Sequence, residues 1–511
     1  MNKPRLVRGA GLAAVLLFLV LVGRFWHPVY RFTSFLQLDA TNDEVKIAAF
    51  HELPVYVYRD TGGYDGLYYA QIAYHPLLTA PELRPAMDNF SYRARRILTP
   101  ALAWVLAAGQ PRLIVHLYSC LNILAWLVVA GLLWRLLRVA DGRSLGAWAG
   151  LLFSAGALLS VRFALTDLVT LAALTAAMAA MERGRPGWAV TGLAAAGLGR
   201  ETSVVALPGF LRPPWLSWRN AAKAAAAFAP LAAWLFYVRW KTDWDDQPWG
   251  NFTWPGAGWL EKGRAAVAAI GHTPEPVLAG TTLLTFVGLT AQAIFFCKPR
   301  WADPWWRFGA PYVALLLFFG TAVWEGFPGA APRVLLPLSV AFFVLVIRHR
   351  ASWLWLLAGA LTVPSGLLAL AHPTSDPREI AAARGQQIAS VVRAGPGWLG
   401  REQAGRHVWA WNPGRGELEI ETWPRAVPAV RLKFFLRGLG TRHVVIRQAG
   451  REIWRGPVGR ELQAVEIAVP LRRGRADLEF VTDAPGVAEG PWPGARSLAF
   501  AIYDPKIVTL P

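Results

Sequence analysis

The sequence predicts a polytopic α-helical membrane protein that is followed by a β-sandwich. Of the 511 residues, 54% are hydrophobic and only 17% are charged, and the mean hydropathy is +0.32. A soluble protein of this size rarely reaches such values, because charged residues must coat its surface. Many segments are long and apolar enough for a bilayer, which requires roughly 20 residues. The chain beyond residue 405 changes to short alternating runs.

The helical part is predicted to have about nine full spans and one re-entrant helix pair. The spans are 9–26, 112–134, 145–161, 167–182, 222–240, 277–297, 307–324, 333–348 and 352–371. The apolar segment 187–211 is interrupted by the sequence GRETS. Two half-helices that dip in and return explain it, as does one span with buried charge. Shorter helices are expected in the membrane interface at 97–109 and, with amphipathic character, at 259–270.

The distribution of Lys and Arg predicts the orientation, since these residues favour cytoplasmic loops. With the N-terminus inside and 187–211 re-entrant, all six short basic loops fall on the cytoplasmic side. The first apolar segment is expected to be a retained span, because no small-x-small cleavage site closes it. The predicted domains are a transmembrane domain at 1–371 with an outward loop at 27–111, a connector at 372–404 and a β-sandwich at 405–511.

The tail has the period of half-buried strands. In LEIETW (418–423), apolar or small residues alternate with Glu419 and Glu421, and several such runs separated by Gly and Pro predict a sandwich. Exposed tryptophans could bind sugar, but packing inside the sandwich is the favoured explanation. The candidates are Trp409, Trp411 and Trp492.

Charge, cysteine content and motifs narrow the class of function. The net charge of +19 fits the positive-inside rule better than nucleic-acid binding, because no basic run is interleaved with aromatics in a soluble module. Two cysteines indicate neither a disulfide framework nor a metal cluster. No Walker loop, GxGxxG, HExxH or GxSxG pattern stands out, so machinery for ATP hydrolysis is not visible.

Asp65, in the sequence GYDGLYYAQIAYHP (63–76), is the first candidate site residue. Glycines on both sides permit a tight turn, and a short helix with an aromatic face is expected after it. Capping of that helix is the simpler explanation, since Asp is a favoured N-cap, and it is compatible with catalysis. The same loop holds two more carboxylates, Asp60 and Asp88.

Arginines accompany these acids at the outward side. Arg93, Arg95 and Arg96 either snorkel to lipid headgroups or bind an anionic lipid phosphate. In RFALTD, Arg162 and Asp167 either anchor and cap a helix or take part in the site.

Two further pairs of charges stand within or beside apolar segments. Arg200 and Glu201 lie inside an apolar segment, where charges line a cavity or pair with each other, and a functional role is favoured. Glu325 and Arg333 lie at the outward ends of two spans.

These motifs, in this order, resemble the GT-C superfamily of integral-membrane glycosyltransferases that use polyprenyl-phosphate sugars. They are YDGLYYAQIA, DNFSYRARRILTPALAW, RFALTDLVTLAAL, GLGRETSVVALP and WEGFPGAAPRVLLPL. The resemblance covers about residues 1–371 and is strongest to the bacterial mannosyltransferase-like, cell-surface glycopolymer branch. It implies a protein of the bacterial inner membrane, and the distribution of Lys and Arg predicts that its N-terminus is cytoplasmic and that the site and tail are outside.

The resemblance implies that Asp65 is the general base and that the reaction inverts the anomeric carbon. Many family members have two neighbouring acids, but Gly66 follows Asp65 here, so the second acid would be Asp60, Asp88 or Asp167. The phosphate and the substrate would be bound by Arg93, Arg96, Arg162, Arg200, Glu201, Glu325, Arg333 and Tyr69. No particular cofactor is implied, and the need for a divalent metal is left open.

The implied partners are a polyprenyl-phosphate sugar donor, an acceptor that is a glycan, lipid or protein, and membrane lipids, with no nucleic acid. Two other classes of function compete with this interpretation. A transporter or flippase of envelope glycolipids should show internal repeats and charges at the midplane, whereas the acids here gather in outward loops. A non-catalytic envelope assembly protein would use the sandwich as its working part.

Overall fold

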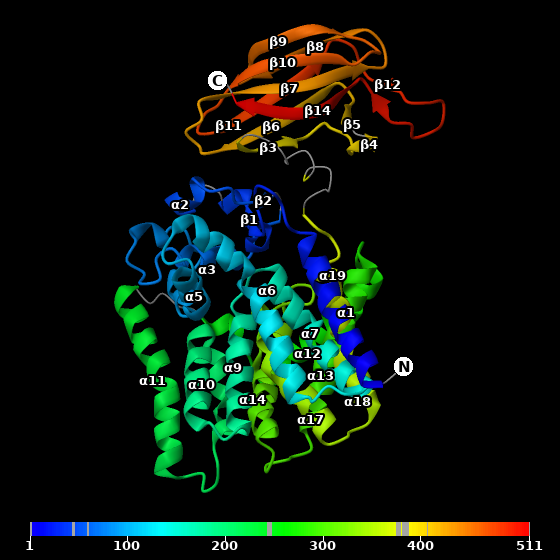
Figure 1. The fold of residues 1–511 in the computed structure, drawn as a ribbon. Helices are drawn as coiled ribbons and strands as arrows, with labels where there is room; N and C mark the ends of the chain where they lie inside the picture. The colour runs from blue at the N-terminus through cyan, green and yellow to red at the C-terminus, as the bar shows by residue number, and fades with distance from the viewer. Residues whose placement is uncertain are drawn as a thin grey trace. The chain divides into compact units, whose positions relative to one another are not determined.

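The computed structural model describes residues 3–42, 46–58, 61–242, 248–374, 380, 388–405 and 407–509 (Figure 1). The chain divides into two compact units. The first, called here the helical unit, comprises 1–25, 32–47 and 56–373. The second, called the β-unit, comprises 26–31, 48–55 and 374–511. Two pieces of the predicted outward loop therefore belong to the same unit as the C-terminal sheets.

The helical unit is built from apolar helices. They are α1 (Lys3–Gly23), α3 (Gly66–Ile72), α4 (Phe90–Ala94), α5 (Leu98–Leu106), α6 (Pro111–Leu136), α7 (Gly142–Leu152), α8 (Ala155–Arg162), α9 (Asp167–Glu182), α10 (Pro186–Gly199), α11 (Trp218–Lys241), α12 (Ala257–His272), α13 (Pro276–Phe296), α14 (Pro304–Phe318), α15 (Thr321–Trp324), α16 (Ala331–Val334), α17 (Leu336–Arg348), α18 (Trp353–Ala360) and α19 (Val363–Ala369). Short 3-10 helices include η1 (Thr33–Leu36), η2 (Ala40–Asn42), η3 (Pro81–Leu83), η4 (Glu201–Phe210) and η5 (Pro248–Asn251). Helices are thus present at the expected positions of the interfacial and amphipathic segments, as α5 and α12.

Four helices of the described part, α1, α6, α11 and α13, are long and apolar enough to cross a membrane. The pair α7 and α8, bent by 41° at a short break, would make a fifth. By length and composition these helices are those of a membrane protein. The predicted total of nine spans and a re-entrant pair stays a prediction.

Several segments predicted as continuous spans are broken, which corrects the sequence analysis. The segment 145–161 is divided between α7 and α8, where the Ser154 side chain accepts a hydrogen bond from the Ala157 N–H and so starts a new helix. The segments 307–324, 333–348 and 352–371 are likewise divided between α14 and α15, α16 and α17, and α18 and α19. Hydropathy averages over such local breaks, because one capping residue changes the mean very little. The break predicted within 187–211 is present, between α10 and η4.

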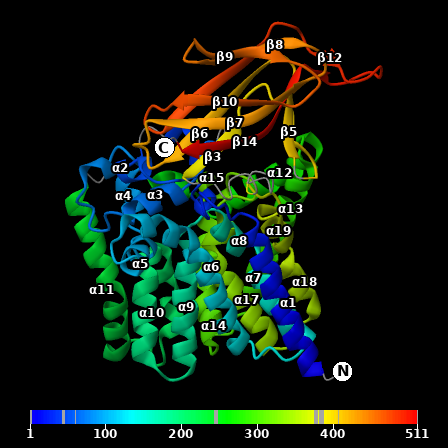
Figure 2. The same cartoon turned by 45° about the horizontal axis from the view of Figure 1, so that its top comes forward.

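A small parallel sheet organises the start of the loop that carries Asp65. Strand β1 (Leu38–Asp39) pairs with β2 (Val57–Tyr58), and α3 follows after Gly62 and Gly63, both at φ +72°. A left-handed backbone of this kind favours glycine. Figures 1 and 2 show α3 and α5 at one end of the helical unit, with α9 extending away from them.

Two five-stranded sheets form most of the β-unit, with strand orders β10-β7-β14-β5-β4 and β3-β6-β11-β8-β9. The strands are β3 (Ala389–Ala394), β4 (Glu402–Ala404), β5 (His407–Asn412), β6 (Arg415–Trp423), β7 (Ala429–Gly438), β8 (Arg442–Gln448), β9 (Arg451–Val458), β10 (Gln463–Pro470), β11 (Arg475–Thr482) and β14 (Phe500–Thr509), with a separate pair β12 (Val487–Ala488) and β13 (Ser497–Leu498). All pairings within the two large sheets are antiparallel.

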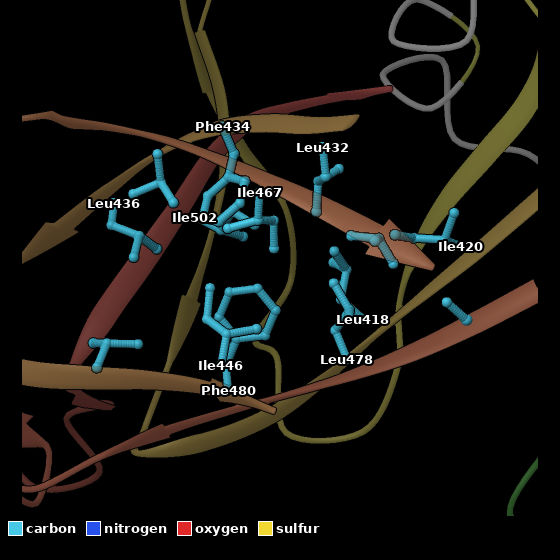
Figure 3. Close-up of a cluster of buried hydrophobic side chains, with 14 of the residues drawn as sticks. Leu418, Ile420, Leu432, Phe434, Leu436, Ile446, Ile467, Leu478, Phe480 and Ile502 are labelled. Carbon is cyan, nitrogen blue, oxygen red and sulfur yellow. The ribbon is translucent and has the colours of Figure 1, made fainter. Parts of the chain in front are cut away.

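One buried apolar cluster receives side chains from both sheets (Figure 3). Leu418 and Ile420 of β6 point into it together with Leu432 and Phe434 of β7. The alternation predicted for 418–422 is confirmed, because these positions are buried in turn while the glutamates between them are partly exposed. Trp411 packs in a second buried cluster.

The sheets begin before the predicted boundary at 405. Strands β3 and β4 lie within the segment expected to be a connector, and they pair with β6 and β5. A strand as short as β4 has too few residues for an alternating pattern, so pairing with a partner defines it. Two stretches of the predicted connector, 375–379 and 381–387, lie outside the described residues.

Side chains of the first loop segment also belong to the β-unit. The Tyr30 hydroxyl donates to Glu421 at 3.3 Å and accepts from Arg393 at 2.6 Å, and its ring lies edge-on to Trp423. The Arg425 side chain of the sheets donates to the carbonyl oxygen of His51, in α2 (Ala48–His51). These contacts explain why 26–31 and 48–55 group with the sheets.

Candidate functional site

Eight charged residues, distant in sequence, are linked in the helical unit. We call them the charged cluster: Asp65, Asp88, Arg93, Arg96, Asp167, Arg200, Glu201 and Arg333. They come from the start of α3, from α4 and the residues beside it, from the start of α9, from the junction of α10 and η4, and from α16. The structure therefore brings together most of the residues singled out in the sequence.

Asp65 does not cap α3 through its side chain, which corrects the simpler explanation given above. It occupies the N-cap position at φ −56° and ψ −28°, and its carboxylate makes no capping hydrogen bond. An N-cap residue normally has extended backbone angles, which direct its side chain toward the first free N–H groups. Here the backbone is already helical, and Oδ1 lies 2.9 Å from Nη2 of Arg93.

Arg93 joins Asp65 to Asp88. Its Nε and Nη2 donate to the two oxygens of Asp88 at 3.0 and 2.6 Å, a bidentate geometry that fixes the guanidinium plane. Burial raises the pKa of the Asp88 carboxyl, but the hydrogen bonds from Arg93 outweigh it and hold that pKa below its usual value. Asp88 is thus a partner that orients Arg93 toward Asp65.

Arg96 is held by two tyrosines and an acid. Its Nη1 donates to the Tyr69 hydroxyl and its Nη2 to the Tyr92 hydroxyl, both at 2.7 Å. Its Nε lies 3.4 Å from Oε2 of Glu201. Tyr69 belongs to α3, so this contact ties the helix behind Asp65 to the junction of α10 and η4.

Asp167 is enclosed by two arginines. One oxygen is paired with Arg200, and the other lies 3.5 Å from Nη1 of Arg333. Nη2 of Arg333 donates to the Tyr64 hydroxyl at 2.7 Å, which connects this group to the residue before Asp65. Arg200 and Glu201 therefore do not pair with each other, one of the two arrangements expected for them, because each faces a different partner.

Exposure separates the four acids into two kinds. The side chain of Asp167 is only 3% exposed, whereas those of Asp65, Asp88 and Glu201 are 28%, 43% and 25% exposed. Asp88 is engaged through both oxygens. The Oδ2 atom of Asp65 has no hydrogen-bond partner among the described residues. Asp65 thus combines access with a free oxygen, and its side chain is slightly more exposed than that of Glu201.

Two predicted site residues stand apart from the charged cluster, and a third lies outside the described residues. Arg162 donates to the Tyr58 hydroxyl at 3.1 Å and lies over the ring of Phe25. Glu325 lines a separate pocket of about 330 Å³ with Lys262. Asp60 lies outside the described residues.

Asp39 was not singled out in the sequence, yet it holds the segment before Asp65. This buried carboxylate accepts hydrogen bonds from the N–H and hydroxyl groups of both Thr41 and Thr61, at 2.8–3.1 Å. Desolvation raises the pKa of Asp39, but these four hydrogen bonds outweigh it and lower the pKa to about 2. The only signal in the sequence is a lone acid in the apolar run FLQLDAT, which does not reveal its partner 22 residues away.

An apolar pocket of about 560 Å³ is lined partly by residues close in sequence to the charged cluster. Ile97 directly follows Arg96, and Leu198 lies two residues before Arg200, so the pocket shares chain segments with the cluster. Its lining is apolar and aromatic: Leu77, Ile97, Leu198, Pro230, Ala233, Trp234 and Tyr237. Two hydrogen bonds hold α11 here, from Trp234 to the Ala94 carbonyl and from Tyr237 to the Leu77 carbonyl.

Among the described residues, no group of three or more His, Cys, Asp or Glu side chains is arranged to hold a metal ion. Both cysteines are free thiols. The charged cluster itself offers carboxylates, several fixed guanidinium groups and tyrosine hydroxyls.

Comparison with known proteins gives a distant structural similarity. No protein-family model matches the chain, and no curated protein does. Among solved structures, the chain is similar to the arabinosyltransferase EmbB from Mycobacterium smegmatis, with a TM-score of 0.23 and 12% sequence identity. The match covers 81% of this chain and 59% of that one. Function is therefore inferred from the contacts of this chain itself.

Proposed function

We propose that this protein is a GT-C-type membrane glycosyltransferase that moves a sugar from a polyprenyl-phosphate donor to an acceptor hydroxyl. The observation that carries the proposal is the accessible carboxylate of Asp65 beside fixed arginines. A base and a cationic surface for a leaving phosphate are the two groups that such a transfer requires. In this proposal the acceptor is a glycan, a lipid or a protein of the cell envelope.

The transfer breaks one bond and forms one. The acceptor oxygen attacks the anomeric carbon as its proton passes to Asp65, and the bond from that carbon to the phosphate oxygen breaks with inversion. The departing lipid phosphate gains negative charge, which the guanidinium groups of Arg96, Arg200 and Arg333 offset in the transition state. Because these groups are already held by tyrosines and acids, little reorganisation accompanies the reaction.

The apolar pocket supports a lipid-linked donor over a soluble one. It lies along α11, one of the helices able to cross a membrane, and shares segments with the charged cluster. A ligand with an anionic head and an apolar chain would match both features. The proposal also includes the predicted nine spans, the re-entrant pair, the β-sandwich, and a bacterial inner membrane with the N-terminus cytoplasmic and the site outside.

Replacement of Asp65 by Asn tests the proposal. The amide oxygen can still accept from Arg93 but cannot take a proton, so transfer from purified polyprenyl-phosphate sugars should fall by at least about 100-fold. Asp65→Asn should leave membrane insertion unchanged, and Glu466→Gln, an exposed position of the β-unit, serves as the control. Full activity of Asp65→Asn would overturn the assignment. Movement of intact donor across the bilayer without its consumption would support a flippase instead.

A further inference from the structure

A further pocket, lined by charged side chains, lies far from the charged cluster. It has a volume of about 460 Å³ and is lined by Arg300 and Trp301 before α14, by Asp303, and by Arg348 and His349 at the end of α17. Two chain segments lead to it from the cluster. Helix α9 begins at Asp167 and ends at Glu182, which pairs with Arg348, and 16 residues of helix span about 24 Å.

The segment formed by α16 and α17 also runs from the charged cluster to the pocket, so the two sites lie at opposite ends of the helical unit. Arg333 of α16 belongs to the charged cluster, whereas Arg348, at the end of the following α17, lines the pocket. The separation is close to the roughly 30 Å thickness of a bilayer's apolar core. A charged cluster at one membrane face therefore places this pocket near the other face.

The pocket has positive charge that its own acids do not balance. Arg348 is paired with Glu182 and with Asp303 at 3.3 Å, and Asp303 also contacts Nε2 of His349 at 3.0 Å. Arg300, by contrast, has no carboxylate within salt-bridge distance in the described part of the chain. Its Nη1 is buried without a hydrogen-bond partner, and its guanidinium lies 4.6 Å from the centre of the Phe295 ring.

A second arginine beside the pocket is also bound without any carboxylate. The side chain of Arg307 donates to the carbonyl oxygens of Pro208, Trp301 and Leu211. Three arginines (Arg300, Arg307 and Arg348) lie in or beside the pocket, and among the described residues two carboxylates (Glu182 and Asp303) pair with Arg348 alone of the three. An anionic group would supply the missing partner, since the Arg300 side chain is half-buried and its Nη1 is enclosed without a hydrogen-bond partner.

We propose that this pocket binds the phosphate of an anionic phospholipid headgroup. Trp301 is exposed beside it and stacks edge-on with Trp306, and tryptophans at this depth favour the membrane–water interface. The orientation proposed above places the pocket at the cytoplasmic leaflet, which is rich in anionic lipids. Arg300 and His349 would contact the phosphate, and Trp301 would lie against the glycerol and upper acyl chain.

The test uses the full chain, purified in detergent and delipidated. Binding of phosphatidylglycerol, phosphatidylcholine and inorganic phosphate is measured by native mass spectrometry and by the shift of the thermal midpoint. We expect phosphatidylglycerol to bind and stabilise, and Arg300→Gln to weaken that binding about tenfold. The matched control is Arg135→Gln, because Arg135 is exposed in the last turn of α6 and lines none of the pockets described here.

Each outcome decides the proposal. Loss of phosphatidylglycerol binding in Arg300→Gln but not in Arg135→Gln supports the pocket, and Trp301→Ala provides the same comparison if Arg300→Gln does not fold. Equal loss in both arginine variants would show general charge attraction and overturn it. Equal binding of phosphatidylcholine, or protection by inorganic phosphate alone, would overturn the assignment to an anionic lipid. These measurements do not depend on sugar transfer, so the proposed function stands or falls separately.

Discussion

Arginine–carboxylate pairs occur in both units of this protein, but they differ in what surrounds them. In the charged cluster Asp167 is almost fully buried between Arg200 and Arg333. On the β-unit Glu466 pairs with Arg431 and Lys433 at 3.0 Å, and all three side chains are 38–47% exposed. Exposed pairs contribute about 0–1 kcal/mol, whereas buried charges lose their hydration and require complete pairing. The difference shows that simple surface stabilisation does not explain the charged cluster.

The same contrast appears in how each unit is stabilised. The β-unit has an apolar cluster shared by two sheets, with its charges outside (Figure 3). The helical unit instead places guanidinium groups, acids and tyrosine hydroxyls where its segments meet. Buried polar groups that are retained at such a cost are expected to act on a substrate.

Asp167→Asn should have the largest effect on stability. The change leaves Arg200 and Arg333 without their shared negative partner, and breaking a buried pair in this way costs about 3–5 kcal/mol. We expect a lower thermal midpoint and loss of sugar transfer. In Asp167→Asn combined with Arg200→Gln, part of the stability should return, because one unpaired charge is removed. If Asp167→Asn unfolded at the same thermal midpoint as the wild type, the importance assigned to burial of this pair would be contradicted.

His27 provides a smaller, pH-dependent test in the β-unit. Its Nδ1 accepts hydrogen bonds from the N–H groups of Val29 and Tyr30. Burial, and then the charge of Arg393, lower the His27 pKa to about 4 from its ordinary 6.5. Below pH 6.5 the unfolded segment binds a proton that the folded one does not, so stability is lost as the pH falls from 6.5 to about 4, by about 3 kcal/mol.

Hydrogen exchange of peptides covering 26–31, corrected for its intrinsic pH dependence, measures this loss. In His27→Asn the protection should no longer change across that window, because the amide does not titrate. An unchanged slope in that variant would show that another group causes the effect.

Asp39→Asn should reduce transfer without destroying the fold. An amide oxygen accepts more weakly than a carboxylate, and loss of these hydrogen bonds should cost about 1–2 kcal/mol. Because Asp39 holds Thr61 and not the substrate, we expect kcat to fall about tenfold with little change in KM. Thr61→Val, which removes the hydroxyl from the same carboxylate, should act in the same direction. Normal kcat in both variants would show that Asp39 does not help to position Asp65.

Glu466→Gln should have the smallest effect. Its pair with Arg431 and Lys433 is exposed, so the free energy of unfolding should change by less than about 1 kcal/mol. Sugar transfer should remain at the wild-type level. A large loss of stability would break the comparison between exposed and buried pairs.

Much of the candidate site could be predicted from the sequence, because charged residues occur within or beside apolar segments. Arg200 and Glu201 interrupt an apolar segment, and Asp65 stands between glycines. Their partners were not visible, because pairing depends on which segments pack together. Tyr64 and Tyr92 were also missed, since an aromatic residue in an apolar loop does not reveal that its hydroxyl accepts from Arg333 or Arg96.

The sequence by itself determined the apolar helices, the position of the break at Arg200 and the alternating burial of β6, because these follow from local composition and period. Only the tertiary structure decided that Asp65 faces Arg93 instead of capping α3, and that Arg162 and Glu325 lie elsewhere. It also decided that pieces of the first loop belong with the C-terminal sheets. The reason is physical: a side chain's partner is set by contacts between distant segments, and neither hydropathy nor spacing encodes those contacts directly.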